Sequence, residues 1–188
     1  MPVLKTDICV IGAGSGGLSV AAGAVQLGLS VVLIEKEEMG GDCLNRGCVP
    51  SKSLLAMAKK GMTFHQAHQH VQQAITTIAP HDSVERFEKM GCTVIRQPAR
   101  FIDRNTLECA DGQTIRARYI VIAAGSRPHI PDIKGLDADK VLTNETLFTL
   151  SEKPKHLAII GGGPIGVEMA QAHANMGCRV TLMTRGEI

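Results

Sequence analysis

Residues 7–17 read DICVIGAGSGG, a short apolar run that ends in a cluster of glycines. The run DICVI is rich in β-formers and predicts a buried parallel strand. The glycines fit the pattern G-x-G-x-x-G at Gly12, Gly14 and Gly17. In this pattern the first glycine permits a tight turn, the second lets backbone approach a pyrophosphate, and the third lets a helix pack closely on the strand. The helix N-terminus then faces the phosphate charge.

The residues that follow complete a βαβ unit. LSVAAGAVQLG, residues 18–28, predicts a helix of small residues, and SVVLIE predicts a second buried strand that ends at Glu35. A carboxylate at that position can accept hydrogen bonds from a ribose. The alternative is a helix that simply packs closely on its strand, beside an ordinary surface glutamate. The order of strand, glycine turn, helix and strand favours dinucleotide binding.

The same pattern returns in residues 156–185, which read HLAIIGGGPIGVEMAQAHANMGCRVTLMTR. Its glycines are Gly161, Gly163 and Gly166. The second strand of this unit ends at Thr184, where an NAD-binding unit usually has an acid, and Arg185 comes next. An arginine there suits a ribose 2′-phosphate and favours NADPH over NADH, although a solvated arginine at a strand end is the alternative.

The segments between the two fingerprints are mixed. Residues 49–77 predict helices, residues 92–119 predict a small antiparallel meander in four short segments that begin at TVIRQ, and YIVIAAG (119–125) predicts another buried strand. RPHIPDIKG and EKPK read as connections. We therefore expect an α/β chain. A Rossmann-like domain with a parallel sheet and a small antiparallel meander covers residues 1–150, and the truncated first βαβ unit of a second Rossmann-like domain covers residues 151–188.

Composition excludes several classes of function. The chain has 188 residues, of which 44% are hydrophobic, and a net charge of +2 with one Tyr and no Trp. It shows no basic stripe with stacking aromatics, so we expect no nucleic-acid partner. Its apolar runs are well short of the roughly 20 residues that span a membrane, and its start does not read as a signal peptide. We therefore expect a cytoplasmic protein without a membrane partner, in which structural disulfides are rare.

The segment GGDCLNRGCVPSK, residues 40–52, holds two close cysteines, Cys43 and Cys48. A zinc site would need a second ligand pair at short spacing, and the other cysteines are scattered. The tract FHQAHQH could supply metal ligands from His65, His68 and His70, but it reads better as the polar, solvated face of a helix. We therefore expect no metal site.

A disulfide between these two cysteines requires a bend. The Cα atoms must lie about 4.4–6.8 Å apart, whereas positions i and i+5 of a straight helix are already about 7.5 Å apart along its axis. Cys48 comes just before Pro50, a good first helical residue. Helix-terminal amides and nearby Lys52 would favour the thiolate of Cys48. This is the constellation for thiol–disulfide exchange.

The string GGDCLNRGCVPSK between two dinucleotide fingerprints resembles the class I pyridine nucleotide-disulfide oxidoreductases, the family of dihydrolipoamide dehydrogenase, glutathione reductase and mercuric reductase. The resemblance covers essentially the whole chain. YIVIAAGSRPHIPDIKGL is similar to the family segment that closes the flavin site, with Ala123-Ala124-Gly125 in place of the usual A-T-G. The resemblance implies that the first domain binds FAD, needs a later segment for completion, and is followed by an NAD(P)H domain.

The family pattern also implies a role for each motif residue. The first fingerprint would hold the FAD pyrophosphate, Glu35 its ribose, and the second fingerprint NAD(P)H. Further FAD contacts would come from Gly41, from Asp42, where the family more often has Thr, and from Ala124 and Gly125. The implied cofactor-binding set is Gly12, Gly14, Gly17, Glu35, Gly41, Asp42, Lys52, Ala124, Gly125, Gly161, Gly163, Gly166 and Arg185.

The implied catalytic residues are Cys43, Cys48, Lys52 and Glu168. Cys48 would face the flavin and Cys43 would attack the substrate. Lys52 would lie near the flavin N5 and pair with Glu168, whose alternative is an ordinary helix-surface carboxylate. The family pathway sends a hydride from NAD(P)H to FAD and electrons to the Cys43–Cys48 disulfide, and the resulting dithiol reduces the substrate.

We therefore expect the N-terminal part of an FAD-dependent NAD(P)H:disulfide oxidoreductase, a homodimer that acts on a small-molecule disulfide, a dithiol or a metal ion. The family's catalytic His–Glu pair belongs to a C-terminal domain, so we expect these residues alone not to complete turnover. The wording L-N-x-G-C-V-P-S-K is nearer to the lipoamide and mercuric types than to the glutathione type. The alternatives are a flavin NAD(P)H oxidase or transhydrogenase, or a non-catalytic nucleotide-binding or redox-sensing fragment.

Overall fold

The computed structural model describes residues 2–186 and divides into two compact units. The first unit comprises Met1–Asn45 and Ile78–Arg127, and the second comprises Arg46–Thr77 and Pro128–Ile188. Each unit is therefore built from two separate stretches of sequence. The predicted domain boundary at residue 150 stays a prediction, since these units follow contacts within this chain alone.

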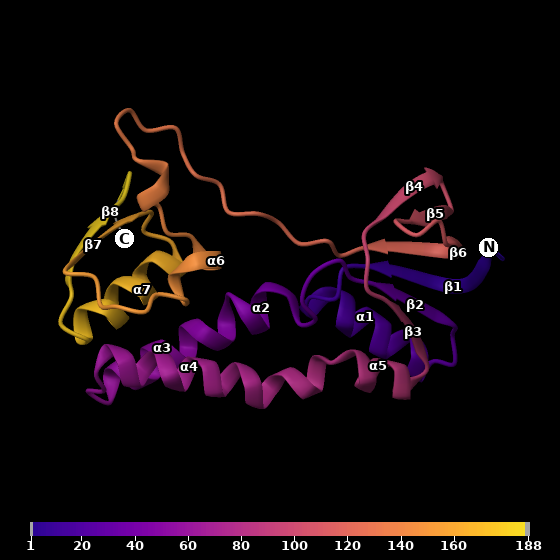
Figure 1. Ribbon diagram of the computed structural model, residues 1–188, viewed down its shortest axis with the longest axis horizontal. Coiled ribbons are helices and arrows are strands. Elements are labelled where there is room, and N and C mark those ends of the chain that lie inside the picture. The colour runs from indigo at the N-terminus through magenta and orange to yellow at the C-terminus, as the bar shows by residue number, and fades with distance from the viewer. Residues whose placement is uncertain (1, 187–188) are drawn as a thin grey trace. The chain divides into compact units, whose positions relative to one another are not determined.

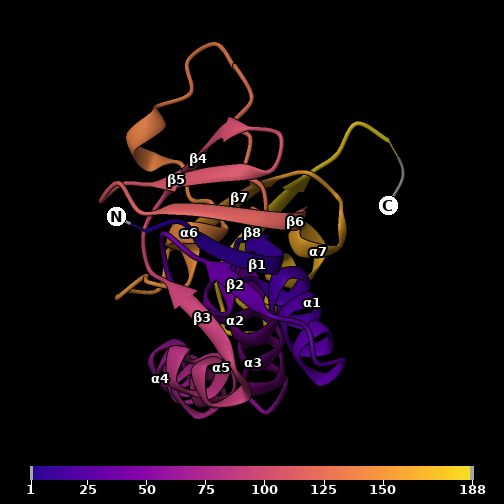
Figure 2. The same ribbon diagram turned by 90° about the vertical axis from the view of Figure 1, so that its right-hand side faces the viewer.

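The first unit is built on one mixed sheet with the strand order β3-β2-β1-β6-β5-β4. Neighbours within β3, β2, β1 and β6 run parallel, while β5 and β4 continue the sheet as antiparallel strands (Figure 2). This confirms the predicted α/β class with a parallel sheet and an antiparallel extension. The strands are β1 (Leu4–Ile11), β2 (Val31–Ile34), β3 (Cys92–Ile95), β4 (Ala99–Asp103), β5 (Thr106–Cys109) and β6 (Thr114–Ile122).

Helices α1 and α5 pack on this sheet and bury one apolar cluster with it (Figure 1). The cluster joins Leu18 of α1 and Phe87 of α5 to Val10 and Leu33 of the strands. A second cluster contains Cys9, Leu107 and other strand residues. The helical elements of the unit are α1 (Ser15–Gln26), α2 (Gly41–Asn45), η1 (Ala79–Asp82) and α5 (Val84–Met90).

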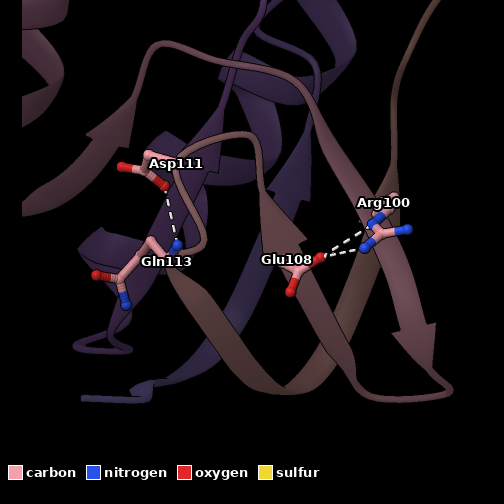
Figure 3. Close-up of polar contacts among 4 residues, drawn as sticks. All are labelled: Arg100, Glu108, Asp111 and Gln113. Carbon is pink, nitrogen blue, oxygen red and sulfur yellow. Dashed lines mark hydrogen bonds and ion pairs between the residues drawn. The ribbon is translucent and has the colours of Figure 1, made fainter. Parts of the chain in front are cut away.

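The predicted meander needs one correction. Its first segment, TVIRQ, overlaps β3, which pairs parallel with β2 at Val31 and Cys92 rather than with the antiparallel strands. The reason is that α5 acts as a crossover, so the chain re-enters the sheet in the parallel direction. The remaining segments form the antiparallel part. Figure 3 shows two polar contacts of this part. Arg100 Nε donates to Glu108 Oε2 at 2.9 Å, and the backbone amide of Gln113 donates to Asp111 Oδ1 at 2.9 Å.

The prediction of a buried strand at YIVIAAG is right for the strand, which is the end of β6 and stops at Ile122, but wrong for the burial, because no residue from 119 to 125 is buried. Ile115 and Ala117 of β6 are buried, but Tyr119 is 59% exposed and Ile122 is 70% exposed. Among the described residues, the neighbouring elements of the first unit therefore cover only the first half of this strand.

The second unit combines helices with the second βαβ unit. Strands β7 and β8 are parallel, with His156 opposite Arg179, as the repeated pattern predicted. Helix α3 packs against α7, and together with α4 they bury an apolar cluster that includes Leu54, Val71 and Met169. The elements are α3 (Cys48–Lys59), α4 (Phe64–Ile78), η2 (Ala138–Lys140), α6 (Asn144–Leu147), β7 (His156–Ile160), α7 (Pro164–Asn175) and β8 (Arg179–Met183).

The histidine tract on α4 is only partly the solvated face that the sequence predicted. His65 and His70 are exposed, but His68 is buried beside Phe64, with 4.1 Å between the ring centroids. Positions 64, 67, 68 and 71 share one face of the helix, which points into the core. Within residues 2–186, no cluster of three or more His, Cys, Asp or Glu side chains has an arrangement suited to a metal ion. The same residues contain no helix of the length and apolarity that a membrane crossing requires.

Candidate functional site

The first fingerprint forms the turn between β1 and α1. Gly12 has φ +102°, a left-handed conformation, and a Cβ there would lie 2.2 Å from the carbonyl oxygen of Ala123. A Cβ on Gly17 would lie 1.8 Å from the carbonyl oxygen of Gly12. Only glycine fits at either position. The turn and packing roles predicted for Gly12 and Gly17 are therefore confirmed.

The middle glycine of the fingerprint lies in a different environment. Gly14 is the N-cap of α1, and a Cβ there would meet only Gly41 Cα, at an ordinary 3.8 Å. Its lack of a side chain is thus not required by packing. The first four backbone amides of a helix have no partner within that helix, and they carry partial positive charge. The N-terminus of α1 is therefore suited to a phosphate group.

Glu35 closes the turn from the side of β2. Its Oε2 accepts a hydrogen bond of 2.7 Å from the backbone amide of Ala13, and its Oε1 accepts one of 2.7 Å from the amide of Glu37. The carboxylate thus fixes the backbone of the fingerprint. Each oxygen can accept more than one hydrogen bond, so the half-buried group keeps acceptor capacity for a ribose hydroxyl.

The loop before α2 packs directly on the fingerprint. The amide of Gly40 donates to the carbonyl of Ala13 at 2.9 Å, and a Cβ on Gly41 would lie 2.6 Å from Gly14 Cα. Gly41 has φ +56°, and Asn45 Nδ2 donates to its carbonyl at 2.9 Å. The sequence analysis missed Gly40. The Gly-Gly dipeptide was the available signal, because two adjacent glycines favour a close backbone approach.

The segment after β6 contacts the same turn from the other side, because β1 lies between β2 and β6 in the sheet. The amide of Ala123 donates to the carbonyl of Ile11 at 2.8 Å, and a Cβ on Gly12 would lie 3.1 Å from Ala124 Cα. Gly125 follows with φ +69°. The structure therefore gathers four predicted segments of the first unit at one place. Asp42 is exposed on the short helix α2.

These residues fit a dinucleotide. The crowded glycines Gly12 and Gly17 make a tight turn, the open Gly14 starts a helix, and Glu35 supplies an acceptor at the end of the next strand. The first unit thus has a donor and acceptor set suited to the pyrophosphate and ribose of a dinucleotide.

The second fingerprint repeats this geometry in the second unit. Gly161 has φ +113°, and a Cβ on Gly166 would lie 2.1 Å from the carbonyl oxygen of Gly161. Gly163 is the N-cap of α7, with no atom within 4 Å of a Cβ built there, and Pro164 occupies the first turn. The chain therefore contains the same glycine-rich turn between a strand and a helix twice.

The end of β8 carries the residues predicted to select the coenzyme. Thr184 Oγ1 accepts from the amide of Gly186 at 3.1 Å and donates to the Gly186 carbonyl at 2.6 Å, so it shapes the turn. Arg185 is exposed. The position where an NAD-binding unit usually has an acidic residue is thus occupied by Thr184, and the exposed guanidinium of Arg185 follows it.

The two cysteines of the motif lie on different helices. Cys43 is half-buried on α2 in the first unit, and Cys48 is exposed at the start of α3 in the second unit. The helix begins at Cys48 rather than at Pro50, with Gly47 as its N-cap. Proline is tolerated there because the first amides of a helix have no intrahelical partner. The two helices are interrupted after Asn45, in the stretch where the sequence required a bend.

Lys52 and Glu168 are in direct contact, as predicted. Lys52 Nζ of α3 lies 2.6 Å from Glu168 Oε1 of α7. This hydrogen bond is the main reason that the pKa of Glu168 is lowered. Residues far apart in sequence thus join the helix of the cysteine motif to the helix that opens the second fingerprint. Neither fingerprint pattern by itself indicates this contact.

Two βαβ units with glycine turns place the chain among the Rossmann-like dinucleotide-binding proteins. Residues 6–188 match the family described as pyridine nucleotide-disulphide oxidoreductase, and the chain belongs to that family.

Named relatives agree with this assignment. The mercuric reductase of Streptomyces lividans is 36% identical over 97% of this chain and 43% of its own length. The dihydrolipoyl dehydrogenase of Geobacillus stearothermophilus is 32% identical over 98% and 43%. A solved Cu(II) complex of a mutant of the HOCl-induced flavoprotein disulfide reductase RclA from Escherichia coli is similar over 99% of this chain and 44% of its own, with a TM-score of 0.90 and 30% identity. The chain thus spans less than half of the length of these relatives.

Proposed function

We propose that the chain is the N-terminal part of an FAD-dependent NAD(P)H:disulfide oxidoreductase. The observation that carries the proposal is the Lys52–Glu168 contact of 2.6 Å, which links the cysteine motif to the second fingerprint within a member of this family. A purely nucleotide-binding protein has no need of a close cysteine pair in which the helix of one cysteine, Cys48, is joined by an ion pair to the helix of the second nucleotide turn. Membership of the oxidoreductase family therefore does not favour the alternative of a non-catalytic fragment.

In this proposal the first unit binds FAD. The amides at the start of α1 and the open Gly14 would receive the pyrophosphate, and Glu35 would accept from the ribose. Gly41, Asp42, Ala124 and Gly125 would line the remainder. When bound, FAD would supply two-electron transfer between NAD(P)H and a disulfide.

The cysteine motif and Glu168 would prepare the exchange chemistry. Cys48 begins α3 and is exposed, so its sulfur is accessible for thiol–disulfide exchange. Cys43 would be the thiol that attacks the substrate. Glu168 would hold Lys52 through their hydrogen bond. A reduced pair would then open a substrate disulfide by thiolate attack through a mixed disulfide.

The coenzyme and substrate follow from two local features. Exposed Arg185 after Thr184 favours NADPH over NADH. The motif wording and the relatives support a substrate of the dihydrolipoamide or mercuric type, that is, a small disulfide, a dithiol or a metal ion. We place the complete protein in the cytoplasm as a homodimer whose partner subunit supplies the catalytic His–Glu pair.

The test is anaerobic reduction of the complete FAD-loaded protein, followed by absorbance spectroscopy. A long-wavelength thiolate–flavin charge-transfer band should form and should be absent in Cys48→Ser. Cys43→Ser should keep the band, because the flavin-facing sulfur remains. Cys178→Ser, a buried cysteine outside the motif, is the matched control and should behave like the unmodified protein. An unmodified protein that binds FAD but gives no band would overturn the assignment. A substrate panel of lipoamide, glutathione disulfide and mercuric ion would then identify the substrate.

A further inference from the structure

The carboxylate proposed to bind the ribose begins a loop that connects β2 to α2. The loop covers residues 35–40 and belongs to no helix or named strand. Its first residue is fixed through the backbone, since the amide of Glu35 donates to the carbonyl of Ile95 at 2.9 Å. Its last residue is fixed on the fingerprint, since the amide of Gly40 donates to the carbonyl of Ala13 at 2.9 Å. Side chains are therefore needed to hold the middle of the loop.

Glu37, in the middle of this loop, is held on both sides of its Cα atom. Its backbone amide donates to Oε1 of Glu35 at 2.7 Å. Its backbone carbonyl accepts a hydrogen bond from Nη2 of Arg96. The backbone of Glu37 therefore connects the guanidinium of Arg96 to the carboxylate that would accept from the ribose.

Arg96 reaches the loop from the strand beside β2. It follows Ile95, the last residue of β3, which pairs in parallel with Ile34 at the end of β2. The carboxyl ends of parallel strands form the edge at which α/β proteins bind nucleotides. Arg96 is exposed and belongs to neither apolar cluster of the first unit. Its role is therefore in its polar contact with the loop rather than in the core.

The contacts form a continuous path from β3 to the fingerprint. Arg96 donates to the carbonyl of Glu37, and the amide of Glu37 donates to one oxygen of Glu35. The other oxygen of Glu35 accepts from the amide of Ala13 at 2.7 Å. The first of these bonds has a charged donor, and such bonds are stronger than neutral ones. Both carboxylate oxygens are thus fixed by backbone amides, one of which belongs to a residue that Arg96 holds.

We propose that Arg96 is a positioning residue for the carboxylate of Glu35 and acts through the backbone of Glu37. The inference rests on the proposed function, in which the first unit binds FAD and Glu35 accepts from its ribose. An acceptor that is already held in place binds its ligand more tightly, because less conformational freedom is lost on binding. Arg96 therefore strengthens the binding of a ribose with free hydroxyls without contacting the ribose.

The first test uses the complete protein without FAD and measures amide hydrogen exchange at single-residue resolution by mass spectrometry. Arg96→Met keeps an unbranched side chain and removes the N–H donors. The Glu37 amide should then exchange about fivefold faster, the factor expected for one lost hydrogen bond of ordinary strength. The amide of Asn105 is the matched control. It donates to Asp103 Oδ1 at 2.8 Å, also two residues back, and its exchange rate should not change.

The second test measures the affinity of the complete protein for two flavins by fluorescence quenching. One is FAD, and the other is an FAD analogue whose adenosine ribose lacks both hydroxyls. Arg96→Met should weaken the binding of FAD about fivefold and leave that of the analogue nearly unchanged, because the analogue has no hydroxyl to donate to Glu35. Arg96→Lys keeps a charged N–H donor and should restore most of the affinity for FAD. Arg104→Met, at an exposed arginine of the same unit, is the matched control and should keep both affinities.

The results separate this inference from the proposed function. Equal exchange of the Glu37 amide in the unmodified protein and in Arg96→Met would overturn the role of Arg96, whatever the flavin does. An unchanged affinity for FAD in Arg96→Met, equal weakening of both flavins, or a lysine variant no better than the methionine variant would also overturn it. Faster exchange together with failure of the unmodified protein to bind FAD would support the positioning of Glu35 by Arg96 and reject the proposed function.

Discussion

The backbone amide of Ala13 donates a hydrogen bond of 2.7 Å to Oε2 of Glu35, across the first βαβ unit. The acid therefore holds the fingerprint turn in place before any nucleotide binds. This explains why a carboxylate at the end of β2 can serve two purposes, since one oxygen fixes the turn and spare acceptor capacity remains for the ribose.

Glu35→Gln should weaken FAD binding by about tenfold or more, because a hydrogen bond to a charged acceptor contributes about 1.5–3 kcal/mol. Glutamine has an NH2 donor in place of one of the two oxygens, so one of the two backbone amides that the carboxylate accepts from would face a donor instead. Quenching of FAD fluorescence on titration measures the affinity. Glu88→Gln, an exposed glutamate on α5, is the control. Unchanged FAD affinity in Glu35→Gln would contradict the ribose and turn roles together.

The fingerprint glycines predict a sharp contrast between neighbours. Gly17→Ala should destabilise the first unit by at least about 2 kcal/mol, because its Cβ would overlap the Gly12 carbonyl at 1.8 Å. Gly16→Ala should be neutral or stabilising, since nothing lies within 4 Å of its Cβ. Denaturant unfolding measures both. A similar loss in both variants would contradict the role of the close contact between Gly17 and the Gly12 carbonyl.

Two buried histidines predict a loss of stability in acid. Burial lowers the pKa of His68 and of His173 below 6.5, and the Nε2 atoms of both are buried with no hydrogen-bond partner among the described residues. His173 Nδ1 donates to the Met169 carbonyl at 2.8 Å, so the neutral ring is satisfied on one side only. The unfolded chain takes up protons near pH 6.5, where the folded unit does not. Stability is therefore complete above about pH 6.5 and falls below it, by up to about 1.4 kcal/mol per pH unit for each histidine.

The measurement is urea unfolding at pH 7.5 and at pH 5.5. A chain with both His68→Leu and His173→Leu should lose most of the difference between the two pH values. His65→Gln, an exposed histidine on the same helix as His68, should retain it. A pH dependence that persists in the double variant would assign the effect to other groups.

Arg185→Glu should reverse the coenzyme preference of the complete enzyme. The proposed contact between the exposed guanidinium and the 2′-phosphate would be lost, and the new carboxylate would repel that phosphate while accepting from an unmodified ribose. We expect the ratio of kcat/KM for NADPH over NADH to fall by about tenfold or more. Arg179→Glu, an exposed arginine at the other end of β8, is the control. An unchanged ratio would reject the preference for NADPH.

The cysteines should differ in reactivity when the reduced chain is alkylated. Cys48 is exposed, whereas Cys9 is fully buried and burial raises the pKa of its thiol to about 12. Since the thiolate is the reactive form, iodoacetamide should label Cys48 first and Cys9 only after unfolding. Peptide mass spectrometry at increasing times gives the order. Labelling of Cys9 in the folded chain at the rate of Cys48 would contradict the buried position of β1.

Much of this architecture could be predicted from local patterns. The two βαβ units and the glycine turns were predictable, because positive φ values and helix–strand contact depend on residues near in sequence. The family motif also predicted the contact of Lys52 with Glu168. The parallel pairing of β3, the burial of His68 and the exposure of Ile122 were not predicted, because each depends on which distant element packs on that residue.

The sequence by itself therefore determined the local motifs of the chain, which are two glycine turns, two helix starts and a cysteine motif. Backbone sterics act over a few residues, so these features follow from spacing alone. Only the tertiary structure decided which groups meet, such as Glu35 with the Ala13 amide, or the Gln113 side chain with the Pro2 carbonyl. Those contacts join residues separated by a whole helix or by most of the chain, and their formation depends on packing that no local pattern records.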